Sequence, residues 1–369
     1  MIIPSLCATY TDLKDGVMYS LPDVVSIAVT EERNGAFDLE MQYLYNGENA
    51  EHITCESFIL AVAQRGAAPE PFRVYEITTP ISGIVTIRAH HISYDLDGVV
   101  LQPFNKTGLA NILSEINTQL SGSGFLFVNN GITVSHQFSI STPQTASSVL
   151  GQGEHSLIAD FGAEVSYYWD TANKREVVTL NASRGSASDA MIAYGYNLIK
   201  CDYTVNSDAV YSSICPFFAS EENGVTTLVT LPEITLPTGA TTSRTRVLPV
   251  DLTSEFDSVP TVAQLRAKAN DYIASVDWNA IVSCAVDFVP MENTTEYENN
   301  TEEQNLVLCD TVTVSASVIG VTVTAKVVRT TYNQITEKYT EMTVGTIQAT
   351  IADTIARLEN QSTYTGSVL

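Results

Sequence analysis

The sequence predicts a β-rich α+β protein in which two small β-barrel domains flank an inserted α+β module. Three observations support this fold class: strand-like runs fill the first hundred residues and return after residue 196, an amphipathic helix lies between them, and only 16% of residues are charged. An average protein carries about 25% charged residues. Thr and Val suit the half-buried surface of a pleated sheet, which favours strands throughout.

Residues 1–104 are expected to form the first β-barrel or a small sandwich. Apolar and polar side chains alternate over residues 37–43, the period of a strand with one buried face. The Asn34-Gly35 pair just before them is a strong hairpin turn signal. Further strand-like runs cover residues 24–29, 72–77 and 84–89.

Residues 105–195 are expected to form the α+β module. Five apolar side chains between 109 and 120 share one helical face, and Thr107 is the predicted N-cap of that helix. Two hairpins are predicted after it, one over 125–134 and one over 165–180.

Residues 196–346 are expected to form the second β-barrel, with one helix near 261–273 that opens on a capping box of Thr261 and Gln264. The acidic, Asn-rich stretch 291–304 is expected to be an exposed loop. Residues 347–369 are expected to form a C-terminal helix and tail. Its apolar face either packs on its own domain or pairs with copies of itself; the apolar residues are Ile347, Ile351, Ile355 and Leu358.

The charge balance argues against nucleic-acid binding. Acidic residues outnumber basic ones 42 to 18, which gives a formal net charge of -24, whereas phosphate neutralisation needs a basic face. An acidic channel through which DNA slides without sticking is compatible with this charge. The six cysteines form no C-x-x-C pair and most lie in apolar runs, so reduced core thiols are expected. Neither a signal peptide nor a membrane span is expected.

The sequence predicts no catalytic, cofactor-binding or metal-binding residue and no cofactor. No H-E-x-x-H, nucleophile elbow, Walker A loop, dinucleotide fingerprint or EF-hand loop occurs. His90 and His91 are adjacent in a strand-like run, so their rings are expected to point to opposite faces. Two alternative functions remain open: a cell-wall peptidase or hydrolase that uses His90 or Glu154, and a host-surface glycan binder. The second would use the aromatic run Tyr167-Tyr168-Trp169 as its platform.

Several short stretches, in order along the chain, resemble the phage tail-hub family often labelled prophage tail endopeptidase or phage minor structural protein. The stretch Glu31–Glu40 is similar to that family's E-x-x-N-G-x-[YF]-x-L-E hairpin, and Ala89–Leu96 to its A-x-H-I-x-Y-D-L segment. The other matching stretches are 72–75, 153–157, 161–164, 247–251, 260–265, 308–314, 325–328, Tyr332 and Gly345.

The resemblance implies a fold like that of contractile-phage baseplate hubs. Three copies of such a hub form a ring whose six barrels match a threefold spike to a sixfold tail tube. The implied protein is a structural, non-enzymatic homotrimer at the virion tail tip, assembled in the bacterial host cytoplasm. Its expected partners are the distal tail or tail-tube protein, the tape-measure protein, and spike or fibre proteins. The family's peptidase is expected on a separate C-terminal extension, and this chain stops at Leu369.

Overall fold

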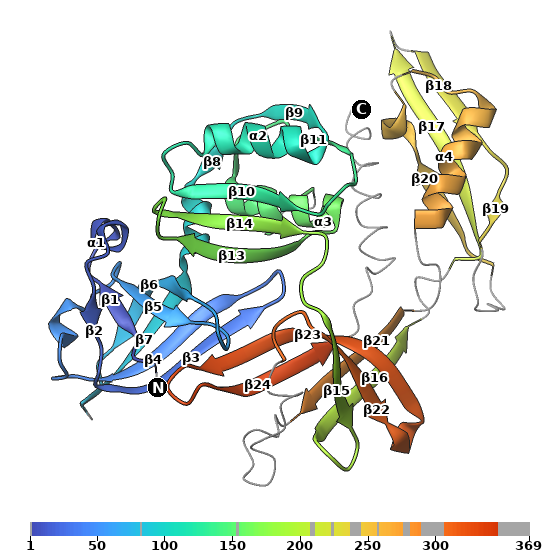
Figure 1. Ribbon diagram of the computed structural model, residues 1–369. Coiled ribbons are helices and arrows are strands. Elements are labelled where there is room, and N and C mark those ends of the chain that lie inside the picture. Colours follow the sequence, from blue (N-terminus) through green and yellow to red (C-terminus); the bar gives the residue numbers. More distant parts are fainter. Residues whose placement is uncertain are drawn as a thin grey trace. The chain divides into compact units, whose positions relative to one another are not determined.

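The computed structural model describes residues 2–345 except 82, 153–154, 207–210, 223–224, 237–244, 257, 276–280 and 289–305 (Figure 1). The chain divides into two compact units: Met1–Cys201 with Ala285–Thr346, and Asp202–Cys284 with Ile347–Leu369. The acidic stretch 291–304 and the helix predicted after residue 346 lie outside the described residues. Among the helices that are described, none has the length and apolar character needed to span a membrane.

The first unit holds most of a 13-stranded sheet in which strands from both ends of the chain lie side by side (Figure 1). Its main path runs β16-β21-β24-β23-β3-β4-β7-β6-β5-β1-β2. Off this path, β22 pairs with β23, and β15 pairs with β22. The strands are β1 (Ser5–Cys7), β2 (Tyr19–Ser20), β3 (Val24–Glu32), β4 (Phe37–Leu44), β5 (Phe58–Val62), β6 (Pro69–Thr78), β7 (Ile84–His91), β15 (Ala187–Ala193), β16 (Leu198–Asn206), β21 (Ile281–Phe288), β22 (Thr311–Ala316), β23 (Val321–Asn333) and β24 (Lys338–Gly345).

The junction between the N-terminal and C-terminal strands is the antiparallel pair β3 and β23. Arg329 lies opposite Glu32, and Tyr332 lies opposite Val29. The hydroxyl oxygens of Thr30 and Thr331 are 3.1 Å apart across this pair. Because β3 pairs with β4 on one side and, over Val29–Glu32, with β23 on the other, the two parts of the sheet form one continuous surface.

Strand alternation builds the N-terminal core as the sequence predicts. In β4, Phe37, Leu39, Met41 and Tyr43 are buried, while the residues between them are more exposed. The Tyr43 hydroxyl donates to the Glu48 carbonyl at 2.6 Å, so even this large polar side chain is satisfied inside the core.

The described strands pair along an open path, so the two barrels expected from the sequence are not confirmed. The coarser part of that prediction holds: the protein is rich in strands and has few helices.

The α+β module has a three-stranded sheet covered by α2 (Figure 1). The hairpin predicted over 165–180 is confirmed, since β13 (Glu164–Asp170) pairs antiparallel with β14 (Arg175–Asn181). The hairpin predicted over 125–134 is wrong, because β10 (Phe125–Asn130) instead pairs parallel with β14. The remaining elements of the module are β8 (Val100–Leu101), β9 (Phe104–Thr107), α2 (Leu109–Gln119), β11 (Gln137–Ile140), β12 (Gln144–Thr145), a π-helical turn (Ser148–Gln152) and α3 (Leu157–Phe161).

The helix predicted over 109–120 is present, but its N-cap is Gly108 and not Thr107. Thr107 is the last residue of β9 and lies opposite Gln137 in the strand pair with β11. Gly108 then turns the chain with φ +82, a backbone conformation that residues with a side chain rarely adopt. The predicted cap residue is therefore used by the strand before the helix.

The second unit contains a four-stranded sheet and one helix packed around their own core. Helix α4 (Val262–Ser275) begins with the predicted capping box: the Gln264 amide donates to the Thr261 hydroxyl at 3.3 Å, and the Thr261 amide donates to the Gln264 side-chain oxygen at 2.9 Å. Leu265 and Ala269 turn inward from this helix. The strands are β17 (Ser213–Glu222), β18 (Val225–Thr230), β19 (Ile234–Thr235) and β20 (Val247–Asp251).

Short helices complete the description. They are α1 (Tyr10–Asp15) and the 3₁₀ turns η1 (Ala50–His52), η2 (Ile92–Gly98), η4 (Thr253–Glu255) and η6 (Ser317–Ile319).

Candidate functional site

The chemically most unusual group of side chains in the first unit is the buried His–Glu cluster, made of Glu70, His91 and Glu176. One ligand-type atom of each residue lies within 4.8 Å of the others. Glu70 comes from β6, His91 from the end of β7, and Glu176 from β14, so the cluster lies where the large sheet meets the α+β module. His91 and Glu176 are 0% exposed.

His91 is fixed by the turn that follows its strand. It caps η2, and its Nδ1 accepts a hydrogen bond from the Ser93 amide at 3.2 Å, with the Ser93 hydroxyl 2.9 Å away. An amide nitrogen can only donate, so the proton of the neutral ring is on Nε2. The ring stacks on Phe37 with centroids 4.2 Å apart, which gives it an apolar surrounding.

The two glutamates approach the Nε2 side of that ring without reaching hydrogen-bonding distance. His91 Nε2 is 3.7 Å from Glu70 Oε2 and 3.9 Å from Glu176 Oε1. Glu70 Oε2 accepts from the Trp169 amide at 3.0 Å, which links β6 to β13. In contrast, His91 Nε2 and both Glu176 carboxylate oxygens have no hydrogen-bond partner among the described residues.

The pKa of Glu176 is raised well above its ordinary value, mainly by burial and to a smaller extent by the nearby Glu70 carboxylate. The backbone amide of Tyr168 lowers the pKa and so opposes part of this rise, although it makes no hydrogen bond to the Glu176 carboxylate. Burial also raises the pKa of Tyr167, whose ring centroid is 5.1 Å from that of His91. Burial and the Glu70 carboxylate both favour the protonated form of Glu176, and a cation in the cluster would oppose them.

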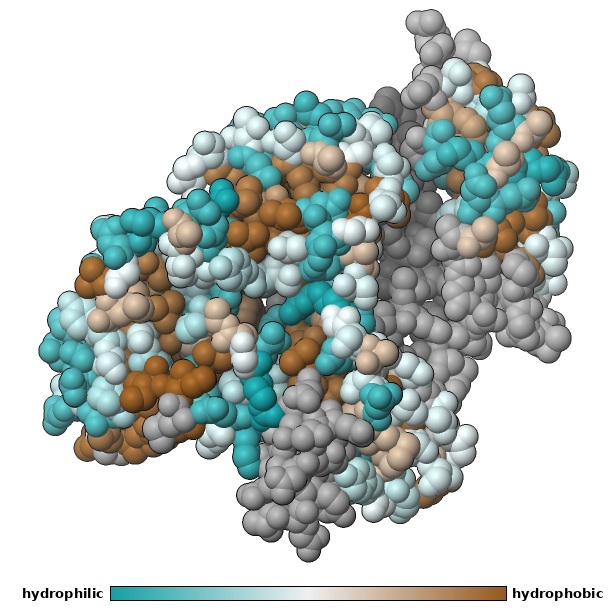
Figure 2. Space-filling view, viewed as in Figure 1, coloured by the Kyte–Doolittle hydropathy of each residue, from teal (hydrophilic) through white to brown (hydrophobic). Residues whose placement is uncertain are grey.

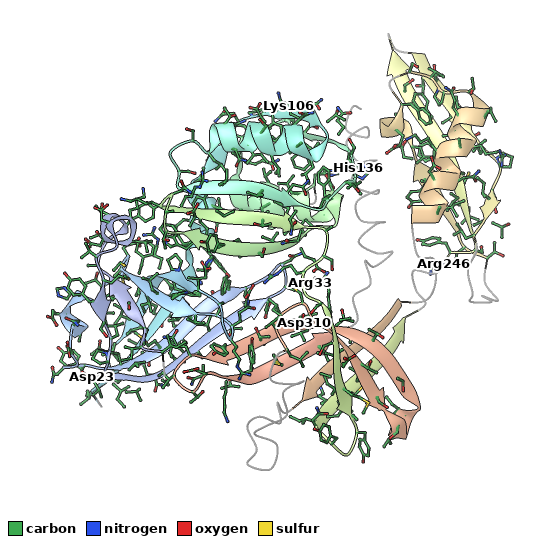
Figure 3. All side chains as sticks on the ribbon, in the orientation of Figure 1. Asp23, Arg33, Lys106, His136, Arg246 and Asp310 are labelled. Atoms are coloured by element: carbon green, nitrogen blue, oxygen red, sulfur yellow. The ribbon has the colours of Figure 1, made fainter. Side chains whose placement is uncertain are left out.

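A second polar group, the Glu164 ion network, joins three segments of the same unit near the β3 and β23 pair. Lys326 Nζ of β23 is 2.6 Å from Glu164 Oε1, and the Arg184 amide donates to Glu164 Oε2 at 2.6 Å. The Arg184 guanidinium donates to Glu31 of β3 at 3.1 Å. Arg33 and Asp310 also lie in this region (Figure 3), and Asp310 accepts from the Ser186 amide at 2.7 Å.

The connection from the module to β15 passes very close to another segment of the same unit. A Cβ on Gly185 would lie 2.2 Å from the carbonyl oxygen of Cys309. Only glycine fits this contact, and its φ of +73 also suits glycine best. Together with the Glu164 ion network, this contact joins the module to the C-terminal strands.

The adjacent histidines point to opposite faces, as the sequence predicts. His90 is on the outer face, where its Nδ1 is 2.6 Å from Asp38 Oδ1. Its ring is stacked between Tyr75 at 4.0 Å and Tyr94 at 4.5 Å. His90 is thus held in an aromatic layer at the surface, while His91 lies in the interior.

The remaining alternative site residues are separated by the structure. In the run Tyr167-Tyr168-Trp169, Tyr168 is 51% exposed but Trp169 is only 5% exposed, since alternate residues of β13 face opposite sides. The prediction of a continuous aromatic platform for glycans is therefore wrong. His155 is exposed and 3.9 Å from Asp160, and Glu154 lies outside the described residues.

Sequence reasoning missed the His–Glu cluster because its members belong to three strands that are distant in the chain. The adjacent histidines predict that one of the two rings is buried, but nothing near them in sequence indicates which one or points to the two glutamates. A weak signal exists for Glu176, which is an acidic residue at an inward position of the alternating strand β14.

Comparison with known proteins shows a likeness to phage tail proteins. Residues 251–355 match the family model described as prophage endopeptidase tail. No curated protein matches the chain. Three solved structures share the fold over almost the whole chain, at low sequence identity.

The first is prophage tail protein gp18 from Listeria monocytogenes EGD-e, with 15% identity and a TM-score of 0.60, covering 97% of this chain and 99% of that chain. The 43 kDa tail protein of prophage MuSo2 from Shewanella oneidensis has 15% identity and a TM-score of 0.56, covering 94% and 98%. A tail protein from Neisseria meningitidis MC58 has 10% identity and a TM-score of 0.52, covering 95% and 98%. The resemblance to phage tail proteins that the sequence predicts is confirmed.

Proposed function

We propose, on the fold that this chain shares with prophage tail proteins, that it is a structural tail-tip or baseplate hub protein of a phage or phage-tail-like particle. The observation that carries the proposal is the near end-to-end likeness to a tail protein, which covers 97% of this chain and 99% of the other. The role is architectural: the chain forms a ring that joins the tail tube to the tip or spike. No enzymatic activity is part of this proposal.

The ring is proposed to be a homotrimer in which each copy contributes two barrel-like domains. The continuous sheet supports this arrangement, because β3 and β23 hold the N-terminal and C-terminal strands of one copy side by side. Exposed apolar side chains of β3, β4 and the turn after β4, including Val25, Leu44 and Tyr45, are available for contacts between subunits. Figure 2 shows apolar surface in this part of the molecule, near β3.

The proposed partners are the distal tail or tail-tube protein, the tape-measure protein, and spike or fibre proteins. The proposed location is the virion tail tip, after assembly in the host cytoplasm. A net charge of -24 suits a ring through which DNA passes without sticking, because phosphates are repelled by acidic surface.

The direct test is the mass of the purified chain by light scattering over a range of concentrations, followed by negative-stain microscopy. Three chains of 40.0 kDa per particle, seen as rings with a pseudo-sixfold outline, are expected. Replacing Val25 and Tyr45 together by Asp should shift the mass towards one chain. A wild-type chain that stays monomeric at all concentrations, also when mixed with the tube protein, contradicts the ring. Peptidoglycan cleavage that is lost in His90→Ala would favour the hydrolase alternative instead.

A further inference from the structure

We propose that the buried His–Glu cluster binds one divalent metal ion of the zinc type, which joins the large sheet to the α+β module. The ligands are His91 Nε2 and one carboxylate oxygen each from Glu70 and Glu176, and a water molecule completes the tetrahedron. The ion has a structural role, and the inference does not depend on the proposed place of the protein in a tail.

The first argument is that the cluster contains buried polar atoms that nothing else in the described residues satisfies. His91 Nε2, Glu176 Oε1 and Glu176 Oε2 are all buried without a hydrogen-bond partner. Buried polar groups are nearly always paired, and a buried carboxylate is stable only when a cation or strong donors compensate its charge. A divalent cation between two carboxylates balances both charges and satisfies all three residues at once.

The second argument is the spacing of the atoms. In a tetrahedral zinc site with metal–ligand distances near 2.0–2.1 Å, ligand atoms are about 3.4 Å apart. His91 Nε2 is 3.7 Å from Glu70 Oε2 and 3.9 Å from Glu176 Oε1. The Glu70 and Glu176 ligand oxygens lie within 4.8 Å of each other, so side-chain movements of about one ångström close the site around the metal.

The third argument is that the three side chains are already oriented by groups outside the cluster. The Trp169 amide holds Glu70 Oε2, and the Ser93 hydroxyl is 2.9 Å from His91 Nδ1. When a metal takes Nε2, the ring proton moves to Nδ1 and the Ser93 oxygen accepts it, which is the usual support of a metal-bound histidine. The Ser93 amide bond to Nδ1 is lost in the same step, and this lowers the affinity without removing it.

The donor set selects the class of metal. One imidazole nitrogen with two carboxylates and one water, in a buried site with three protein ligands, favours Zn²⁺ over Ca²⁺ or Mg²⁺, which prefer six or more oxygen ligands. Because the site is buried, the metal is taken up as the chain folds.

The test uses the full-length, tag-free chain, unfolded in urea with EDTA and refolded with two equivalents of ZnCl₂. After gel filtration, the metal content is measured by mass spectrometry. One zinc per chain is expected in the wild type. In Glu176→Gln, which keeps the shape of the side chain, the content should fall at least tenfold. The matched control is His90→Gln, since residue 90 is the neighbouring histidine on the outer face and should leave the content at one.

The thermal midpoint supplies a second readout. Zinc should raise it in the wild type and in His90→Gln, but not in Glu176→Gln, whose folding is verified by circular dichroism in EDTA. Substoichiometric zinc in the folded wild type overturns the proposal and leaves a hydrogen-bonded water or a shared proton in the cluster. Equal zinc in wild type and Glu176→Gln also overturns it, because the metal is then bound elsewhere.

Discussion

The buried Glu176 carboxyl predicts an unusual pH dependence in the metal-free protein. Burial and Glu70 raise the pKa of Glu176 in the folded state, whereas an unfolded glutamate titrates near its ordinary value of about 4.3. Below that pH both states hold the proton, and Glu176 causes no change in stability with pH. Above it only the unfolded state releases the proton, so folding stability falls as pH rises, until the folded pKa is reached.

The substitution Glu176→Gln removes this term, since glutamine has nearly the same shape and no charge. The free energy of unfolding of the variant minus that of the wild type should be close to constant below about pH 4. It should then grow in favour of the variant by up to about 1.4 kcal/mol per pH unit until the folded pKa is reached. The slope arises because Glu176 is 0% exposed and its ligand oxygen lies within 4.8 Å of that of Glu70.

The assay is urea unfolding in EDTA at half-unit steps from about pH 3 to pH 8, followed by the fluorescence of Trp169. This side chain is buried next to the cluster, and a Trp278→Phe background removes the only other tryptophan. The matched control is Glu51→Gln, whose carboxyl is 72% exposed and should follow the wild type at every pH. Parallel stability curves for wild type and Glu176→Gln would refute the reasoning, because they would mean that Glu176 is ionised in the folded state.

Three further substitutions test, by urea unfolding, the Gly185 backbone contact, the Lys326–Glu164 ion pair and the Thr261 helix cap. Gly185→Ala should destabilise by about 2–4 kcal/mol, because the new Cβ lies 2.2 Å from a carbonyl oxygen; Gly195→Ala has a similar positive φ with open space around it and should cost only about 1 kcal/mol. Equal losses would show that the contact has no effect. Lys326→Met should cost about 2 kcal/mol, since it removes the ammonium bound to the largely buried Glu164 and leaves it the Arg184 amide at 2.6 Å and the Arg33 guanidinium at 3.5 Å. A loss below about 0.5 kcal/mol, as expected of an exposed pair, would contradict this. Thr261→Ala should cost about 1 kcal/mol in the second unit, and helix content that survives unchanged at intermediate urea would argue against the capping role.

The sequence is most informative where local chemistry decides the structure. Alternation over residues 37–43 predicts β4 and its buried face, and Thr261 with Gln264 predicts the start of α4. Both depend on neighbours within a few residues. The fate of residues 125–130 is decided by β14 instead, which arrives later in the chain and takes the parallel position beside them.

The candidate site is hidden from sequence reasoning for the same reason. Glu70 and Glu176 are ordinary acidic residues until the sheet and the module come together around His91. Their burial, and therefore their chemistry, is a property of the tertiary contact. The histidine pair indicates only that the two rings lie on opposite faces, because strand geometry fixes that locally.

The pairing of β3 with β23 has a consequence for how the protein is made. Strand β3 is synthesised early, but its partner begins only at Val321, so one edge of β3 is unpaired during most of synthesis. Unpaired strand edges attract other strands, including those of neighbouring nascent chains. The charged residues Glu31 and Glu32 lie at the end of β3 that later meets β23. They are well placed to keep that edge apart from other chains until the correct strand arrives from the ribosome.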